Sequence, residues 1–171
     1  HFCGLKVLGD KQFIVANVST DQIHLLNFVS NQHKTIDFGV LSSNAGESRY
    51  HINDIEVYKD TIFVSYFSKS GFWKHDVFDG GVAAFDFNGN CLGDLFSGLW
   101  QPHSPRIFDG KLHVLDSSGG QFIRGSHGVR HKFQGFIRGL DSCSGYHFIG
   151  QSETMYVSRK VNMSTHINNT S

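Results

Sequence analysis

An all-β fold built from repeated antiparallel sheets is the architecture that this sequence predicts, and three observations predict it. A short unit recurs four times, beginning at His1, His51, His103 and Phe136. Turn signals rich in Gly, Asn and Asp arrive about every ten residues, as in proteins made of many short strands. The apolar runs between these turns are rich in β-branched and aromatic residues, which favour strands over helices.

Each copy of the unit follows the same frame. A His or Phe is followed four residues later by Ile or Leu, then by a turn, and then by an apolar run that ends in Ser. The copies start 50, 52 and 33 residues apart. A unit that recurs at intervals of tens of residues indicates a solenoid, a propeller or an array. Because the strands come in groups of four, we expect the blades of a β-propeller.

We expect three to four blades within residues 1–160, followed by a polar tail at 161–171. The blades are predicted at 1–40, 51–97, 103–134 and 136–158. The first contains strands on either side of a Gly9-Asp10 turn, and a polar loop at 39–50 follows it. The second carries a long insertion at 69–80 and an Asn88-Gly89 signal, which is typical of a tight β-hairpin. The third has its first turn at Asp109-Gly110, and the fourth breaks off after the strand predicted at 154–158.

Ring closure is a second expectation. Propellers have about four to eight blades, so three full blades and part of a fourth make an incomplete ring. We expect a larger ring, which is completed either by self-association or by segments of a longer protein. A β-sandwich is the alternative fold. It explains the strands but not the repeated unit.

Composition excludes several classes of function. The 15 acidic and 15 basic residues cancel, which argues against a partner such as nucleic acid or an anionic membrane. No stretch reaches the length of a membrane span, and no signal peptide is recognised. The three cysteines, Cys3, Cys91 and Cys143, form no Cys-x-x-Cys pair and are expected to be reduced. These features favour the cytoplasm, although secretion stays open.

The repeat also predicts a site. The first strand of a propeller blade lines the central channel, so equivalent residues of successive blades should converge at one level. By the frame above, His1, His51 and His103 share one position, and three imidazoles could hold a divalent transition metal. The alternatives are that these histidines bond to the backbone of neighbouring blades, or that they contact a ligand without metal.

Polar residues that follow the histidines extend this site. Asn53, Asp54, Arg106 and Arg138 lie a few residues further along the same predicted strands. Two guanidinium groups could bind a carboxylate or phosphate through paired hydrogen bonds. The alternative is an ion pair between blades, with Asp54 among the possible partners.

The insertion at 69–80 supplies the last candidate. It carries Phe72, Trp73 and Phe78 on a predicted loop, where Trp73 could cover the channel mouth or stack on a ligand. The alternative is that the loop folds over the edge of a blade.

No catalytic signature accompanies these residues. The sequence contains no nucleophile elbow, phosphate-binding loop, His-Glu-x-x-His motif or dinucleotide fingerprint. We therefore expect a ligand-binding module for a small anionic or sugar-like molecule or a peptide. The alternative is a metal-dependent lyase or hydrolase, for which only analogy with other propellers argues.

Four motifs also carry a resemblance: His51-Ile-Asn-Asp-Ile, Pro102-His-Ser-Pro-Arg106, the stretch from Asp109 to Ser117, and Gly135-Phe-Ile-Arg-Gly-Leu140. Over residues 50–152 the chain resembles a family of uncharacterised conserved bacterial proteins that are predicted to be β-propellers. Members of that family are longer, so the resemblance implies that this chain matches their middle. It implies the fold and no particular reaction.

Overall fold

The computed structural model describes residues 1–39, 48–125 and 128–152, and this part of the chain is all-β. The first sheet consists of β1 (Phe2–Gly9), β2 (Gln12–Asn17), β3 (Gln22–Asn27) and β4 (Gln32–Asp37). The second consists of β5 (Ile52–Tyr58), β6 (Thr61–Tyr66), β7 (Gly80–Asp86) and β8 (Cys91–Leu99). The third consists of β9 (Pro102–Phe108), β10 (Lys111–Asp116), β11 (Gln121–Arg124) and β12 (Val129–Lys132). The fourth consists of β13 (Phe136–Cys143) and β14 (Tyr146–Ser152).

Every sheet is a simple antiparallel meander in which each strand pairs with the next one in the chain. This confirms the predicted all-β class and the grouping of strands by four in the first three sheets. The one helical element among the described residues is η1 (Trp73–His75), a short turn in the predicted insertion. None of the described segments is a helix that could cross a membrane. The strand predicted at 154–158 and the tail at 161–171 lie outside the described residues.

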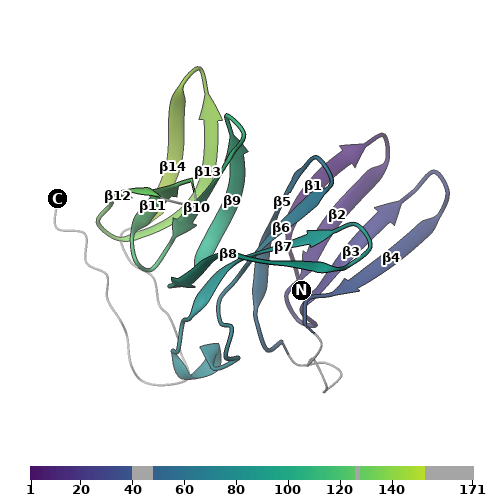
Figure 1. Cartoon of the computed structure of the whole chain (residues 1–171), viewed down its shortest axis with the longest axis horizontal. Coiled ribbons are helices and arrows are strands. Elements are labelled where there is room, and N and C mark those ends of the chain that lie inside the picture. The colour runs from purple at the N-terminus through teal and green to yellow at the C-terminus, as the bar shows by residue number, and fades with distance from the viewer. Residues whose placement is uncertain (40–47, 126–127, 153–171) are drawn as a thin grey trace.

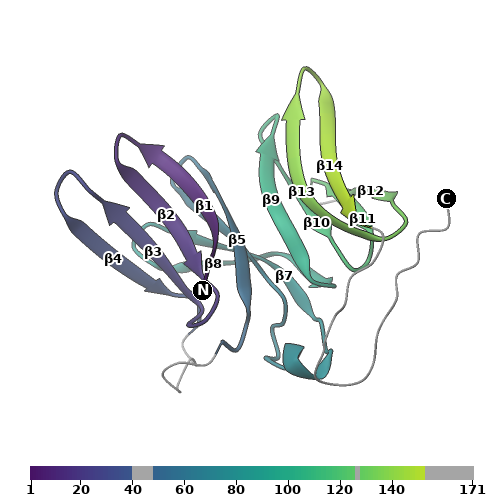
Figure 2. The ribbon, with the colours of Figure 1, turned by 180° about the vertical axis from the view of Figure 1, so that it is seen from behind.

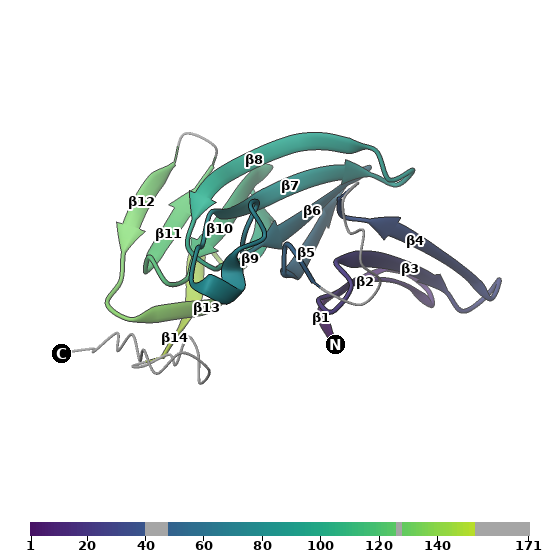
Figure 3. The same cartoon turned by 90° about the horizontal axis from the view of Figure 1, so that it is seen from below.

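The four sheets follow one another along an open curve. Figure 1 shows them in chain order, from the purple first sheet to the yellow-green fourth. Seen from behind, in Figure 2, β9 and β13 again lie side by side, in agreement with their packing contacts. Seen from below, in Figure 3, the last strands β4, β8 and β12 lie on the outside of the curve. The first strands contact one another in turn, because β5 packs against both β1 and β9, and β9 packs against β13.

Three apolar clusters fill the spaces between neighbouring sheets. The cluster between the first and second sheets includes Ile14 and Ile23 on one side and Ile55 and Val64 on the other. The cluster between the second and third sheets and the one between the third and fourth are built in the same way. The second and third sheets therefore each give one face to the preceding sheet and the other to the next, and the fully buried residues lie at these contacts.

One buried carboxylate ties the first sheet to the second. Asp21 is 1% exposed and accepts hydrogen bonds from the backbone N–H groups of Arg49, Tyr50 and Ile52 at 2.5, 2.7 and 3.1 Å. The Ser48 hydroxyl donates a fourth bond at 3.0 Å. These bonds provide an acceptor for the backbone N–H groups of the turn that leads into β5. A side chain of the first sheet therefore fixes the position at which the second sheet begins.

The strand pairing corrects the predicted alignment of the repeat. Ile52 pairs with Tyr66 and Pro102 pairs with Asp116, and each partner is the last residue of a six-residue second strand. The residues before the two first strands are therefore equivalent, and both have a left-handed backbone, with φ of 54° at His51 and 53° at Gln101. The prediction that His103 shares the position of His51 is wrong by two residues. An alignment made on the histidines does not reveal the shift, because residues two apart in a strand lie on the same face.

Candidate functional site

His51 and His103 lie close together although they are not equivalent. The ring of Phe67, which follows β6, stacks on His51 with centroids 4.3 Å apart and meets the ring of His103 edge-on at 5.2 Å. His103 in turn packs edge-on against Phe136 at 5.8 Å. We call His51, Phe67, Trp73, His103 and Phe136 the inner-strand cluster, because it lies where the first strands β5, β9 and β13 begin.

The insertion contributes the remaining ring of the cluster. Trp73 also packs against His51, with ring centroids 4.4 Å apart, and its indole N–H donates to the carbonyl of Ser48 at 3.3 Å. Asp79 organises the loop by accepting hydrogen bonds from the backbone and hydroxyl groups of Ser70 and from the hydroxyl of Ser68, the last at 2.6 Å. The loop therefore covers His51. Of the two other aromatic residues predicted on it, Phe72 is exposed and Phe78 packs edge-on against Phe67 with ring centroids 6.2 Å apart.

Burial keeps both histidines of the cluster uncharged. Desolvation lowers the pKa of His51 to about 4. Desolvation, together with the positive charge of Arg138, lowers the pKa of His103 to about 3. The His103 Nδ1 atom lies 2.9 Å from the carbonyl oxygen of Gln101, which can only accept, so Nδ1 carries the proton and Nε2 keeps a free lone pair.

The polar part of the site is formed in each sheet by the residue two positions after His51 or its equivalent. Counted from the corrected alignment, Cys3, Asn53, His103 and Arg138 are equivalent. Asn53 is 4% exposed, its carbonyl oxygen accepts from Ser65 at 2.7 Å, and its Nδ2 has no hydrogen-bond partner in the described structure. Arg138 is exposed and acts electrostatically on His103. The row therefore offers an unused amide donor, an imidazole lone pair and a guanidinium group.

The next residue along each first strand links that strand to the neighbouring first strand. The Asp54 carboxylate accepts from the backbone N–H of Ser104 at 3.1 Å, and the Ser104 hydroxyl accepts from the N–H of Gly139 at 3.2 Å. Arg106 lies 3.5 Å from Asp54 and donates to the carbonyl of Pro105 at 2.7 Å. Arg106 is thus engaged in the ion pair that was the alternative to ligand binding, and Asp54 acts as a link between sheets.

The proposed metal ligands are not gathered into one group. His1 is exposed and lies beside Cys3, with His1 Nε2 and the Cys3 sulfur 3.3 Å apart. Phe67 packs against both His51 and His103. Across the described ranges, no group of three or more His, Cys, Asp or Glu residues is arranged to hold a metal ion.

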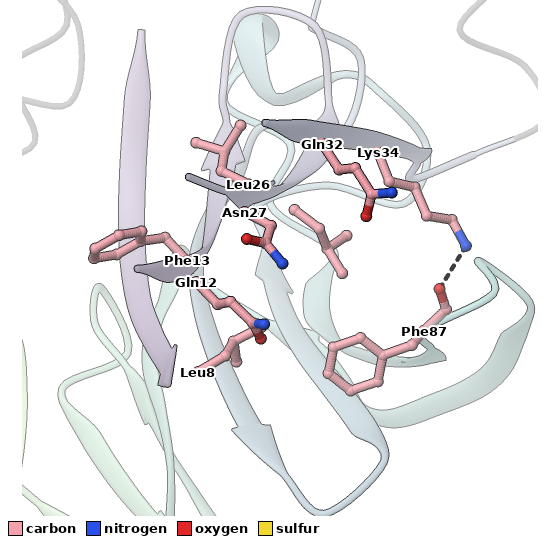
Figure 4. A pocket seen from close by; sticks show the side chains of 9 residues that line it. Leu8, Gln12, Phe13, Leu26, Asn27, Gln32, Lys34 and Phe87 are labelled. Atoms are coloured by element: carbon pink, nitrogen blue, oxygen red, sulfur yellow. Dashed lines mark hydrogen bonds between the residues drawn. The ribbon is translucent and has the colours of Figure 1, made fainter. Parts of the chain in front are cut away.

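A hollow of about 220 Å³ lies at the opposite, hairpin end of the first sheet. Figure 4 shows Leu8 and Phe87 on its apolar side, the amides Gln12 and Asn27, and Lys34, which donates to the carbonyl of Phe87 at 2.7 Å. None of the predicted site residues lines this hollow.

The sequence analysis did not identify Phe67, which packs against both histidines, or Gln101, whose carbonyl accepts a hydrogen bond from His103. The signal was present, because the apolar runs that begin at Ile62 and Leu112 are 50 residues apart, as the strand pairing requires. Alignment on these runs instead of on the histidines would have matched His51 to Gln101.

A comparison with models of protein families gives a match for this chain. The family model described as "Domain of unknown function (DUF4915)" matches residues 7–170. A search of curated proteins finds no match.

Proposed function

The chain belongs to the DUF4915 family, a domain of unknown function, and we propose that it is a binding module for a small anionic ligand at the inner-strand cluster. The observation that carries the proposal is the row of Asn53, His103 and Arg138. Asn53 offers a buried N–H donor without a partner, and buried polar groups are rarely left unpaired. Arg138 supplies the charge, and guanidinium groups bind carboxylate or phosphate through two parallel hydrogen bonds.

The electrostatics of the row support an anion bound by one cation, Arg138, and by one neutral donor, the Asn53 amide. Because His51 and His103 are uncharged at neutral pH, Arg138 is the cation that this row offers to a ligand. The rings of Trp73 and Phe136 beside the row can contact the apolar part of the ligand. No observation among the described residues favours the metal-dependent alternative, so we propose no metal chemistry.

Tryptophan fluorescence tests this function. The chain has two tryptophans, and a Trp100→Phe variant leaves Trp73 as the reporter beside His51. We expect phosphate or a small dicarboxylate such as succinate to change the Trp73 emission with saturation, and neutral glucose to leave it unchanged. Arg138→Gln should weaken binding roughly 10–100-fold, which corresponds to the loss of a charged hydrogen bond. Arg130→Gln, at an exposed site on β12, is the matched control. Equal affinity in the Arg138→Gln variant, or no saturable response to any anion, would reject the proposal.

We further propose that the four sheets are blades of a β-propeller that is completed by association with a second copy. Leu5 is equivalent to Ile55 by strand pairing, and Ile55 is 0% exposed whereas Leu5 is 59% exposed. At the other end, Phe148 is 60% exposed, while Phe63, its equivalent counted from the hairpin turn, is 8% exposed. Positions that an interior sheet buries are thus uncovered at both ends of the curve. Contiguous apolar patches of this kind usually mark interfaces.

Light scattering tests the association. A dimer whose mass falls to the monomer on introducing Leu5→Glu and Phe148→Glu together would support the proposal. Thr61→Glu plus Thr20→Glu, the first at the start of β6 and the second in a turn, is the control with the same change of net charge. A wild-type chain that stays monomeric at all accessible concentrations would reject head-to-tail closure. The balanced net charge supports a protein partner rather than nucleic acid or an anionic membrane.

A further inference from the structure

A cavity of about 450 Å³ lies between the end of the first sheet and the outer part of the second. Its wall includes Phe38, Tyr50, Tyr66 and Phe85, and its mouth includes Lys69 and Asp94. The volume falls in the range of about 300–1,000 Å³ that is typical of small-molecule sites. None of the residues of the inner-strand cluster lines it, so it is separate from the site proposed above.

The wall is formed by a connected group of aromatic rings. Phe38 follows β4 and contacts Tyr50, Tyr66 and Phe85, with ring centroids 5.3, 5.3 and 5.4 Å apart. Tyr66 and Phe85 are almost fully buried, at 1% and 2% exposed, so the inner wall is held rigidly by the core between the first two sheets. A preformed aromatic wall of this kind suits the apolar face of a ring-shaped ligand.

The mouth carries a polar network anchored to the same wall. The Tyr66 hydroxyl donates to one Asp94 oxygen at 3.1 Å, and the Lys69 ammonium group lies 2.5 Å from the other. Burial and the Asp94 charge raise the pKa of Tyr66, so its hydroxyl keeps its proton. Because the carboxylate and the ammonium group neutralise one another, the mouth favours neither an anion nor a cation.

Both members of the ion pair retain hydrogen-bonding capacity. An ammonium group has three donors, and the contacts above use one of those of Lys69. A carboxylate has about four acceptor positions, and the contacts above use two of those of Asp94. A free donor and a free acceptor therefore lie side by side above an aromatic wall. Adjacent hydroxyl groups match this arrangement, since each hydroxyl both donates and accepts. We propose that this cavity binds an uncharged saccharide, with its C–H face against the partly exposed rings of Phe38 and Tyr50 and its hydroxyls on Lys69 and Asp94.

Cys91 provides a reporter for this proposal. It lines the cavity and is exposed, and it is one of three free cysteines in the described structure. In a Cys3→Ser, Cys143→Ser variant, the remaining thiol can be titrated with a chromogenic disulfide reagent. We expect a neutral sugar, tested as glucose, galactose, N-acetylglucosamine and maltose, to slow this reaction with saturation. Succinate should have no effect on it.

Substitutions at the mouth separate binding from a general solvent effect. Asp94→Asn should abolish the protection by the sugar, whereas Asp10→Asn in the exposed turn of the first sheet should leave it unchanged. Asp94 lies on the edge strand β8 and its side chain is 26% exposed, so the variant is expected to fold, and circular dichroism checks this. If it does not fold, Lys69→Gln on the loop tests the same contact. Arg138→Gln should not affect protection, which keeps this test independent of the proposed anion site.

Three results would overturn the proposal. They are the absence of protection by every sugar, equal protection in folded Asp94→Asn protein, and protection by succinate that matches that of the sugars.

Discussion

Acidification should destabilise the protein through the two buried histidines of the inner-strand cluster. The pKa values of His51 and His103 are about 4 and about 3 in the folded chain, and an unfolded histidine has a pKa of about 6.5. Between these values the unfolded chain binds protons that the folded chain does not. The free energy of unfolding therefore falls as the pH drops below about 6.5.

The size of the effect follows from the same values. One pKa unit corresponds to about 1.4 kcal/mol, so at pH 5 each histidine should have lost about 2 kcal/mol of stabilisation relative to pH 7.5. The sum of about 4 kcal/mol is large against the 5–15 kcal/mol that is typical of a folded domain. Because His51 is partly open to solvent, its share is the smaller of the two.

Urea unfolding at pH 7.5, 6.5, 5.5 and 5.0 measures this loss. Other groups also titrate, since burial lowers the pKa of His113 as well. The test is therefore the difference between variant and wild type in the free energy of unfolding that is lost on acidification. The variant His51→Gln, His103→Asn introduces side chains that the chain already uses at equivalent positions, Gln101 and Asn53. It should lose about 4 kcal/mol less than the wild type on acidification to pH 5. His75→Gln, on the exposed loop, should behave as the wild type. An unchanged acid loss in the double variant would refute the assigned pKa shifts.

Three further substitutions test how the sheets are joined, each by urea unfolding at pH 7.5. Gly4→Ala places a Cβ 2.6 Å from the Asp54 Cα at φ of 60°. It should lower the free energy of unfolding more than Gly98→Ala, which has a similar φ of 69° but open space around the new Cβ, and equal losses of free energy would contradict this. Asp21→Asn turns an amide group toward backbone donors and should cost about 2–4 kcal/mol, whereas Asp60→Asn in an exposed turn should cost little, and a neutral effect at Asp21 would remove its linking role. Ser104→Ala leaves the N–H of Gly139 without its acceptor and should cost about 1 kcal/mol, and an unchanged midpoint would show that this bond contributes nothing.

The sequence determined the class of the fold because strand formation depends on local patterns. Short apolar runs separated by turn sequences such as Asp109-Gly110 favour short strands. Because the turns are short, each strand pairs with the next one in the chain in an antiparallel manner. The recurrence of the unit likewise placed the first strands of the sheets. The residues of the inner-strand cluster that belong to this unit, among them His51 and His103, were therefore found by pattern alone.

The contacts between sheets were decided only by the tertiary structure. The strand pairing decides that Gln101, and not His103, is equivalent to His51, since both residues precede a first strand and have a left-handed backbone. An alignment on the histidines is two residues off but keeps the same face inward, so it is not rejected by the alternation of side chains alone. The ion pair of Arg106 with Asp54, the packing of Trp73 against His51 and the cavity beside Phe38 all join residues from different sheets or loops. Such contacts depend on how the sheets pack against one another, and that packing is a property of the whole core rather than of any segment of the sequence.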